Sequence, residues 1–155
     1  MSSHGTTTTA PPPLTDPDLS AEASTLRIAT FRLGRRLRTQ RAVDSMSDGQ
    51  FAVLAALSVH GPHTLGELAE RERVSPPSMN RTVNCLQEAD YIVRSADEKD
   101  GRKVVISLTD AGRAVVEETV RRRDAWVESA LAELSPEDRE LMRRAVVIME
   151  GMATR

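Results

Sequence analysis

The sequence lacks several features that mark particular classes of protein. A single cysteine, Cys85, excludes an internal disulfide, and no cluster of Cys and His has the spacing of a structural zinc site. No apolar run approaches the ~20 residues that span a bilayer, and the first residues lack the apolar stretch of a secretory signal. We therefore expect a cytoplasmic protein with no metal site and no membrane partner.

Aromatic side chains are scarce, and neither sign of charge dominates. The aromatic residues are only 3% of the chain, namely Phe31, Phe51, Tyr91 and Trp126, so any core must be mainly aliphatic, as suits helices. A net charge of -2 argues against a protein that coats nucleic acid through bulk positive charge. Local patches would have to bind DNA, and nearly every basic residue is an arginine, whose planar fork suits phosphate and guanine.

The composition changes near residue 18. Residues 1–18 are rich in Ser, Thr and Pro, and such a segment buries too little apolar surface to offset the entropy of ordering it. We expect a disordered tail there. From Ser20 to about Val43 apolar residues recur at helical spacing among many arginines, which predicts a first amphipathic helix with a basic outer face.

Signals for the start of a helix then follow at short intervals. Ser47 with Gln50 satisfies the capping-box pattern, in which the hydroxyl accepts from an early helical amide and the amide side chain reaches back. Thr64 with Glu67 repeats it, and Ser75 precedes a proline at the first helical position, where a missing N–H costs nothing. The predicted helices run over residues 48–60, 65–72 and 76–89.

The pattern then changes its period. Two short β-rich runs, residues 91–95 and 103–108, are separated by a polar stretch that supplies a turn, which predicts a β-hairpin. Thr109 caps a long helix, and Ser135 with the proline after it caps a last helix that ends near Met152.

This order of elements indicates the fold class. Two short helices joined by a tight turn and followed by a hairpin are typical of a winged helix-turn-helix, whose second helix enters the major groove of DNA. We predict a mostly α fold with a two-stranded β-hairpin wing. Residues 47–109 would form the winged helix-turn-helix DNA-binding region, and the N- and C-terminal helices, residues 19–46 and 110–152, an α-helical dimerisation domain.

The predicted recognition helix has one apolar face and one polar face. Its apolar residues at positions 79, 83 and 86 face inward, which leaves Pro77, Ser78 and Arg81 opposite, near the end that contacts base edges. Arg81 is the best candidate for a bidentate contact to guanine. Ser75 and Ser78 can donate to phosphate or base oxygens. The alternatives are that Ser75 only caps the helix and that Ser78 and Arg81 are plain solvated residues.

A second arginine lies in the turn of the hairpin. Asp100 and Arg102 stand two apart across Gly101, and we expect the carboxylate to hold the guanidinium extended at the tip. Arg102 would then enter a minor groove, where narrow A·T tracts concentrate negative potential. A charged turn is otherwise usually solvated, but the neighbouring helix-turn-helix favours the functional interpretation.

Three stretches together resemble the MarR family of bacterial regulators. They are LGELAERE from Leu65, VSPPSMNRTV from Val74, and DGRKVVISLTDAG from Asp100. The resemblance covers about residues 20–152, and its most specific part is Asp-x-Arg followed by Leu-Thr-x-x-Gly, which ends at Gly112.

The resemblance implies roles for individual residues. Ser78 and Arg81 would face the major groove, Arg102 would enter the minor groove, and Asp100 would orient Arg102. We predict double-stranded DNA as the partner. The full set of predicted DNA contacts is Thr64, Ser75, Pro77, Ser78, Asn80, Arg81, Thr82, Arg102 and Lys103.

The resemblance also implies an obligate homodimer whose first, fifth and sixth helices interlock. Independently, the last helix carries more apolar surface than a terminal helix on a small monomer usually exposes. A two-fold dimer places its recognition helices about one DNA turn apart, which predicts an inverted-repeat operator with half-sites about 10 base pairs apart. The apolar residues of the last helix are Leu141, Met142, Ala145, Val146, Ile148 and Met149.

Many members of the family bind a small phenolic or aromatic anion between the dimer helices and the DNA-binding lobe. We expect no cofactor, but we expect an effector of this kind that releases DNA. The candidate contacts are Phe31, Met46, Phe51, His63 and Trp126, and ordinary core packing is the alternative for each.

The predicted function is sequence-specific repression of transcription by a homodimer. Nothing in the sequence resembles an activated nucleophile with its base, so we predict no catalysis. His60 and His63 lack a clear third ligand for a metal. The alternative function is a protein-interaction module that keeps the winged fold but sequesters another regulator, because acidic residues outnumber basic ones between Thr64 and Asp110.

Overall fold

The computed structural model describes residues 17–154. The chain divides into two compact units, of which the first ends at Arg36 and the second begins at Leu37. Helix α1 (Pro17–Thr39) supplies the described part of the first unit, and seven further elements follow in the second. The predicted disordered tail lies mostly outside the described residues, but its last two residues, 17 and 18, already belong to α1. Proline at a first helical position and an aspartate in the first turn both favour a helix start there.

Helix α1 ends earlier than its sequence pattern suggests. The pattern extends to Val43, but the helix stops at Thr39. Just beyond this end, the Arg41 guanidinium donates to the carbonyl of Arg38 at 2.8 Å. A basic side chain that binds a terminal carbonyl satisfies one of the acceptors that a helix end leaves open.

The three helices that follow start at the predicted caps. Helices α2 (Asp48–His60), α3 (Leu65–Arg71) and α4 (Pro76–Glu88) have Ser47, Thr64 and Ser75 as their N-caps. Both predicted capping boxes are confirmed. In the first box, the Ser47 hydroxyl accepts from the amide of Gln50 at 3.1 Å and the Gln50 side chain accepts from the amide of Ser47 at 2.8 Å.

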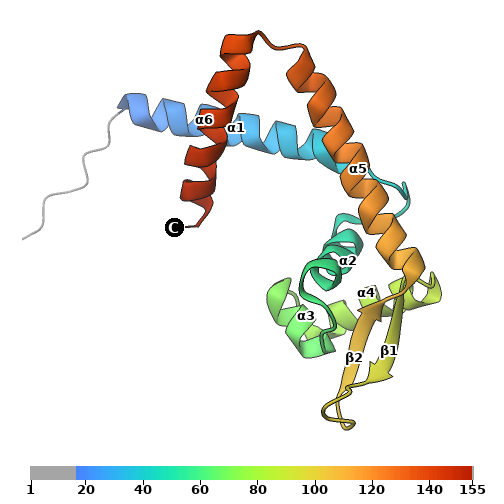
Figure 1. Cartoon of the computed structure of the whole chain (residues 1–155). Coiled ribbons are helices and arrows are strands. Elements are labelled where there is room, and N and C mark those ends of the chain that lie inside the picture. The colour runs from blue at the N-terminus through green and yellow to red at the C-terminus, as the bar shows by residue number, and fades with distance from the viewer. Residues whose placement is uncertain (1–16, 155) are drawn as a thin grey trace, which may run out of the picture. The chain divides into compact units, whose positions relative to one another are not determined.

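The hairpin consists of strands β1 (Ile92–Ala96) and β2 (Val104–Leu108), paired antiparallel with Arg94 opposite Ile106. The residue His63, just before α3, extends this sheet by an isolated bridge to Ile106, with N–O distances of 3.1 and 2.8 Å. The bridge fixes the start of α3 to the base of the hairpin. The tip of the hairpin extends away from α2 and α5 (Figure 1).

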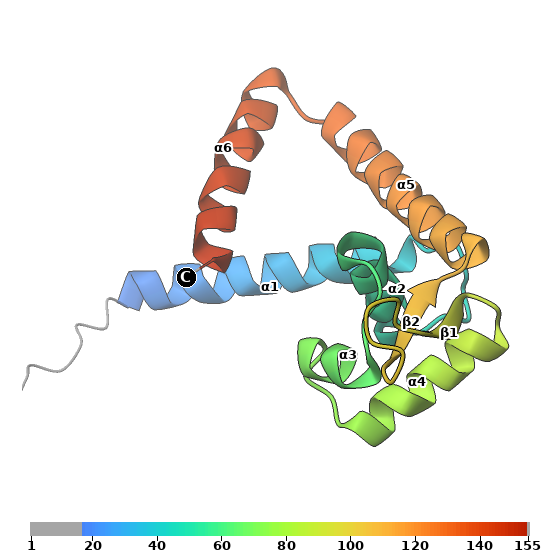
Figure 2. The same ribbon diagram turned by 60° about the horizontal axis from the view of Figure 1, so that its bottom comes forward.

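A mainly aliphatic core lies between α2, α3, α4 and the hairpin. Leu54, Leu68 and Val83 are fully buried, and Leu86 and Ile106 are nearly so. These residues come from four different elements, so the core joins both halves of the helix-turn-helix to the wing. Figure 2 shows α3, α4 and the hairpin together in this lobe.

Helix α5 (Asp110–Ala132) is joined to the lobe through a close contact at its first turn. Thr109 caps the helix, and its hydroxyl also donates to the carbonyl of Asp90 at 2.5 Å. A Cβ on Gly112 would lie 2.0 Å from the carbonyl oxygen of Tyr91. Only glycine fits there, which explains the Leu-Thr-x-x-Gly part of the sequence motif.

Helix α6 (Pro136–Ala153) buries none of its residues within the single chain. Its large apolar side chains stay exposed, and Val147 and Ile148 keep 68% and 64% of their surface. None of the helices within residues 17–154 has the length and apolar character needed to cross a membrane.

Candidate DNA-binding surface

A sharp turn between α3 and α4 sets the direction of the second helix. Arg73 has a φ of 52°, a left-handed conformation, and the amide of Val74 donates to the carbonyl of Ala69 at 3.0 Å. A non-glycine residue at positive φ is uncommon and persists when its surroundings fix it. The turn brings α4 against α3 and presents the start of α4 to solvent.

The faces of α4 agree with the sequence pattern. Met79, Val83 and Leu86 are buried, as predicted, whereas Ser78 and Arg81 are exposed near the start of the helix. Pro77 lies beside them, also exposed. The exposed set places a hydroxyl and a guanidinium where a recognition helix contacts base edges.

The other predicted polar contacts are partly occupied within the chain. The Thr64 hydroxyl donates to the Glu67 carboxylate at 2.9 Å, and the Ser75 hydroxyl accepts from the amide of Ser78 at 3.4 Å. The Thr82 hydroxyl donates to the carbonyl of Ser78 at 3.3 Å. Hydrogen bonds from the backbone amide and the hydroxyl of Thr64 lower the pKa of Glu67, so this cap is charged at neutral pH.

A contact that the sequence analysis missed joins the wing to α4. The guanidinium of Arg94, on β1, donates to Asn84 Oδ1 at 2.8 Å, to Asn80 Oδ1 at 3.3 Å and to Gln87 Oε1. Asn80 is one of the predicted DNA contacts. The spacing of the three amides, four and three residues, puts them on one side of α4, and this periodicity is the only trace that the sequence carries of the contact.

The turn of the wing is fixed by two carboxylates. Asp97 Oδ1 accepts from the amides of Lys99 and Asp100 at 2.9 and 2.8 Å, and these two bonds lower the pKa of Asp97. Asp100 Oδ1 accepts from the backbone amide of Arg102 at 3.2 Å. An aspartate that binds the amide two residues on stabilises a turn by mimicking its backbone bond.

This geometry corrects one prediction. The Asp100 carboxylate was expected to hold the guanidinium of Arg102, but it binds the backbone amide of that residue, and no ion pair joins the two among the described side chains. The carboxylate closes the turn locally, as an Asp does when it accepts from the amide two residues on, and this directs it at the backbone rather than at the guanidinium. Asp100 therefore shapes the turn, and the Arg102 and Lys103 side chains project from it exposed.

The four candidate effector contacts of the second unit, which are Met46, Phe51, His63 and Trp126, do not line one cavity. Met46 and Phe51 line a small cavity of about 10 Å³ together with Arg41, Thr119 and Arg123. That volume is about the space of one water molecule, whereas ligand pockets measure about 300 to 1,000 Å³. The cavity as it stands is therefore too small for an aromatic effector.

The remaining effector candidates lie elsewhere. His63 lines a different, open hollow on α3, with Glu67, Glu70 and Arg71. Trp126 is half-buried on α5 and does not line the small cavity. Phe31 belongs to the first compact unit, where 61% of its surface is exposed.

The small cavity lined by Met46 and Phe51 also contains a partly buried arginine. The Arg123 guanidinium lies over the Phe51 ring, 4.4 Å from its centroid, and its Nε is buried without a hydrogen-bond partner. Burial first and the charge of Arg41 second lower the pKa of Arg123. Arg122 and Arg121, beside it, both bind Glu118 and lower the pKa of that carboxyl to about 2. These arginines are engaged within the chain rather than freely solvated.

His60 and His63 do not make a metal site with their neighbours. Their rings meet edge to face with centroids 6.3 Å apart, and His63 Nδ1 is bonded to the carbonyl of Gly61. Across residues 17–154, no group of three or more Cys, His, Asp or Glu side chains is placed to hold a metal ion.

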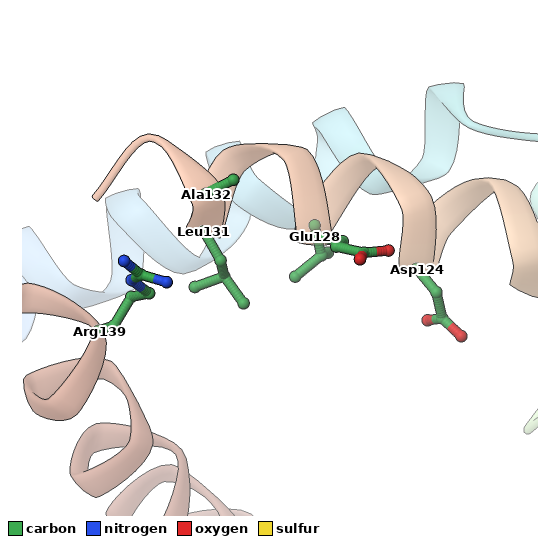
Figure 3. Close-up of a pocket in the computed structure, with 6 residues that line it drawn as sticks. Asp124, Glu128, Leu131, Ala132 and Arg139 are labelled. Carbon is green, nitrogen blue, oxygen red and sulfur yellow. The ribbon is translucent and has the colours of Figure 1, made fainter. Parts of the chain in front are cut away.

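A large open hollow lies between α5 and α6 (Figure 3). It has a volume of about 550 Å³. Leu131 and Ala132 of α5 and Arg139 of α6 face it at one end, and Asp124 and Glu128 line the other. Its lining combines the apolar Val127, Leu131 and Ala132 with the charged Asp124, Glu128 and Arg139.

The fold and the exposed start of α4 define a winged helix-turn-helix transcription regulator. A family model described as MarR family matches residues 46–104. The chain is 36% identical over 127 residues to the uncharacterized HTH-type transcriptional regulator Mb0904 of Mycobacterium bovis, covering 82% of this chain and 89% of that protein. The chain therefore belongs to the MarR family.

Two further likenesses agree. The HTH-type transcriptional repressor Mb2911 of Mycobacterium bovis is 31% identical over 130 residues, which covers 79% of this chain and 92% of the repressor. A crystal structure of a putative transcriptional regulator from Pseudomonas aeruginosa matches with a TM-score of 0.81 at 29% identity, covering 91% of this chain and 99% of the other.

Proposed function

We propose that the chain represses transcription as a homodimer that binds an inverted-repeat operator. The observation that carries the proposal is the start of α4, where Ser78 and Arg81 are exposed beside a wing whose Arg102 also projects into solvent. Arg81 would bind guanine through its two parallel donors, which discriminates a base by about 1 to 3 kcal/mol. Arg102 would enter the adjoining minor groove.

The proposal of a dimer is supported by the apolar face of α6, which the single chain leaves exposed. A terminal helix with no buried residue and several large exposed apolar side chains does not stabilise a monomer. A second copy of the chain would cover this face and fill the hollow between α5 and α6. Because a two-fold axis repeats every contact, the operator would be an inverted repeat.

The charge of the lobe limits how DNA can be bound. With a net charge of -2 for the whole chain, bulk attraction to phosphate is weak, so a few placed arginines and the amides at helix starts must supply the affinity. A dimer would make each of these arginine and amide contacts twice. Binding would still weaken with salt, in proportion to the number of phosphates neutralised.

Release by a small aromatic anion would end repression. Of the four predicted contacts in the second unit, only Met46 and Phe51 share a cavity, and it has room for about one water molecule. An effector would therefore bind in a second conformation or between the two copies. It could shift the protein off DNA only through different affinities for the two states.

Competition between DNA fragments tests the proposal. Purified protein is incubated at physiological salt with the DNA that flanks its own gene and with random DNA of equal length and composition. We expect preferential binding of the flanking DNA, lost in Arg81→Ala and weakened uniformly in Arg102→Ala. Equal binding of both DNAs would contradict the proposal. Recovery of a protein partner without any DNA preference would favour the sequestering module instead.

A further inference from the structure

Arg94 holds three side-chain amides of α4 in one orientation. The guanidinium donates to the oxygens of Asn80, Asn84 and Gln87. Arginine has five N–H donors and no acceptor. An amide group in contact with the guanidinium must therefore turn its oxygen toward it. The opposite orientation would place the NH2 group of the amide against the N–H groups of Arg94, donor against donor.

The position of Arg94 makes this contact rigid. Along β1, Ile92 and Arg94 point to one side of the hairpin, and Ile92 is buried in the core while Arg94 is half-buried. Arg94 pairs with Ile106 in the sheet. Its guanidinium therefore starts from a fixed strand rather than from a mobile loop, and it spans α4 across residues that lie two turns apart.

The consequence for DNA concerns Asn80. This residue is exposed near the start of α4, one position before Arg81. Asparagine usually reads adenine through two bonds at once, with its oxygen accepting from N6 and its nitrogen donating to N7. The Asn80 oxygen is turned toward Arg94 at 3.3 Å, and one of its two lone pairs is occupied, so the NH2 donors of Asn80 are more available to a base than its oxygen.

We propose that Arg94 is a positioning residue that turns the oxygen of Asn80 toward the wing and its NH2 donors outward, so that Asn80 prefers the acceptors of guanine or thymine to adenine. The proposal rests on the DNA-binding function proposed above and adds the chemical class of base that this position reads. In the major groove, guanine offers O6 and N7 and thymine offers O4, all acceptors. Arg94 acts through Asn80 and does not itself touch the base.

The test compares base preference in four proteins: wild type, Arg94→Met, Asn80→Ala and the double variant. Each full-length protein is used to select bound DNA from a random pool, and the preferred sites are then measured with single-base changes. Arg94→Met keeps the apolar stem of the side chain and removes its donors. We expect it to change the preference for adenine over guanine or thymine by about fivefold or more at one symmetric pair of positions.

The double variant tests whether Arg94 affects base preference through Asn80. If Arg94 acts through Asn80, Arg94→Met should change no base preference when residue 80 is alanine. Arg94→Lys serves as the matched control, because a point charge is kept but the planar fork that spans three oxygens is lost. It should bind random DNA as wild type does and yet shift in base preference toward Arg94→Met. An equal loss of affinity on all sequences, or the same shift in the Asn80→Ala background, would overturn the proposal.

A measurement without DNA separates this proposal from the function on which it rests. In NMR spectra of the free protein, the side-chain amide signals of Asn80 and Asn84 should move toward those of free amides in Arg94→Met. Unchanged signals would overturn the positioning role. A wild-type protein with no base preference would overturn both the reading role of Asn80 and the proposed function, and the spectra would then show whether Arg94 still orders these amides.

Discussion

The winged helix-turn-helix lobe and helix α6 differ in what a single chain can complete. The lobe buries Val53, Leu54, Leu68 and Val83 fully and closes its helix starts with side-chain caps. Helix α6 has a good cap at Ser135 but buries nothing. A local signal is therefore enough to form a helix, but stability in water comes from covering an apolar face.

We propose from this difference that the two regions have separate tasks. The lobe is complete by itself, and its exposed polar side chains are available for DNA. Helix α6 is incomplete, and its exposed apolar side chains are available for another copy. If the contrast is real, changes in α6 should abolish assembly and leave the lobe folded, while changes in the lobe should lower stability without separating the copies.

The largest effect is expected from charges on the apolar face of α6. Leu141 and Ile148 keep 61% and 64% of their surface exposed in the single chain. Replacing both by Asp would bury four unpaired charges in the dimer, two from each copy, and raise its dissociation constant by at least ~100-fold. Analytical ultracentrifugation should detect a monomer, and circular dichroism should retain the helical signal.

The control for this variant is Thr154→Asp, at the C-cap of the same helix. This variant adds one negative charge at the end of α6 rather than on its apolar face, and it should leave the dimer intact. A double Asp variant that remains dimeric would show that α6 is not the interface.

The next largest effect should come from the first turn of α5. Gly112→Ala would place a Cβ 2.0 Å from the carbonyl oxygen of Tyr91, so the helix or the start of β1 must shift. Overpacking of this kind costs about 3 kcal/mol. Urea unfolding should measure it. Gly66→Ala is the matched control, since nothing lies within 4 Å of its Cβ, and it should stabilise α3 by about 0.5 to 1 kcal/mol.

These comparisons also indicate how much the sequence can predict. The caps at Ser47, Thr64 and Ser75 were predictable because each cap involves residues only three apart. The inward face of α4 was predictable from its period. Both depend on local chemistry that a short stretch of sequence contains.

Other features depend on contacts across the fold. The sequence does not show that Arg94 reaches amides 7 to 14 residues away, because that requires the angle between β1 and α4. The bonding partner of Asp100 differs from the expected one for a related reason, since only the conformation of the turn decides that its carboxylate accepts from the Arg102 amide. The effector candidates were chosen by residue type, and of the four in the second unit only Met46 and Phe51 line the same cavity.

A smaller effect is expected where α5 meets the loop before α2. Thr119 is 1% exposed, and its hydroxyl accepts from the amide of Ala42 at 3.1 Å. Thr119→Val keeps the shape but leaves that amide without a partner, which costs about 1 to 2 kcal/mol. Differential scanning calorimetry should detect the loss. Thr25→Val, exposed on α1, should change stability by less than about 0.5 kcal/mol.

The smallest effect should be confined to the tip of the wing. Asp97→Asn weakens the two bonds from the amides of Lys99 and Asp100. Hydrogen exchange at these two amides should quicken, and the global unfolding transition should not move measurably.

The same contact predicts a dependence on pH. The pKa of Asp97 in the folded chain lies below its usual value of 3.8, so the stabilisation is fully present above that value. It is lost as the pH falls through the lower, folded pKa. Wild-type exchange at the wing should therefore approach that of Asp97→Asn only in strong acid, and equal exchange at neutral pH would contradict the assigned contact.

Selection of bound DNA from a random pool tests the central claim most directly, because one recovered motif reports specificity, symmetry and spacing together. The account predicts an inverted repeat whose half-sites lie about 10 base pairs apart, centre to centre, from wild-type protein. From Arg81→Ala it predicts a motif that has lost its preference for guanine at one symmetric pair of positions. A wild-type protein that enriches no sequence, or only a single unrepeated site, would contradict it.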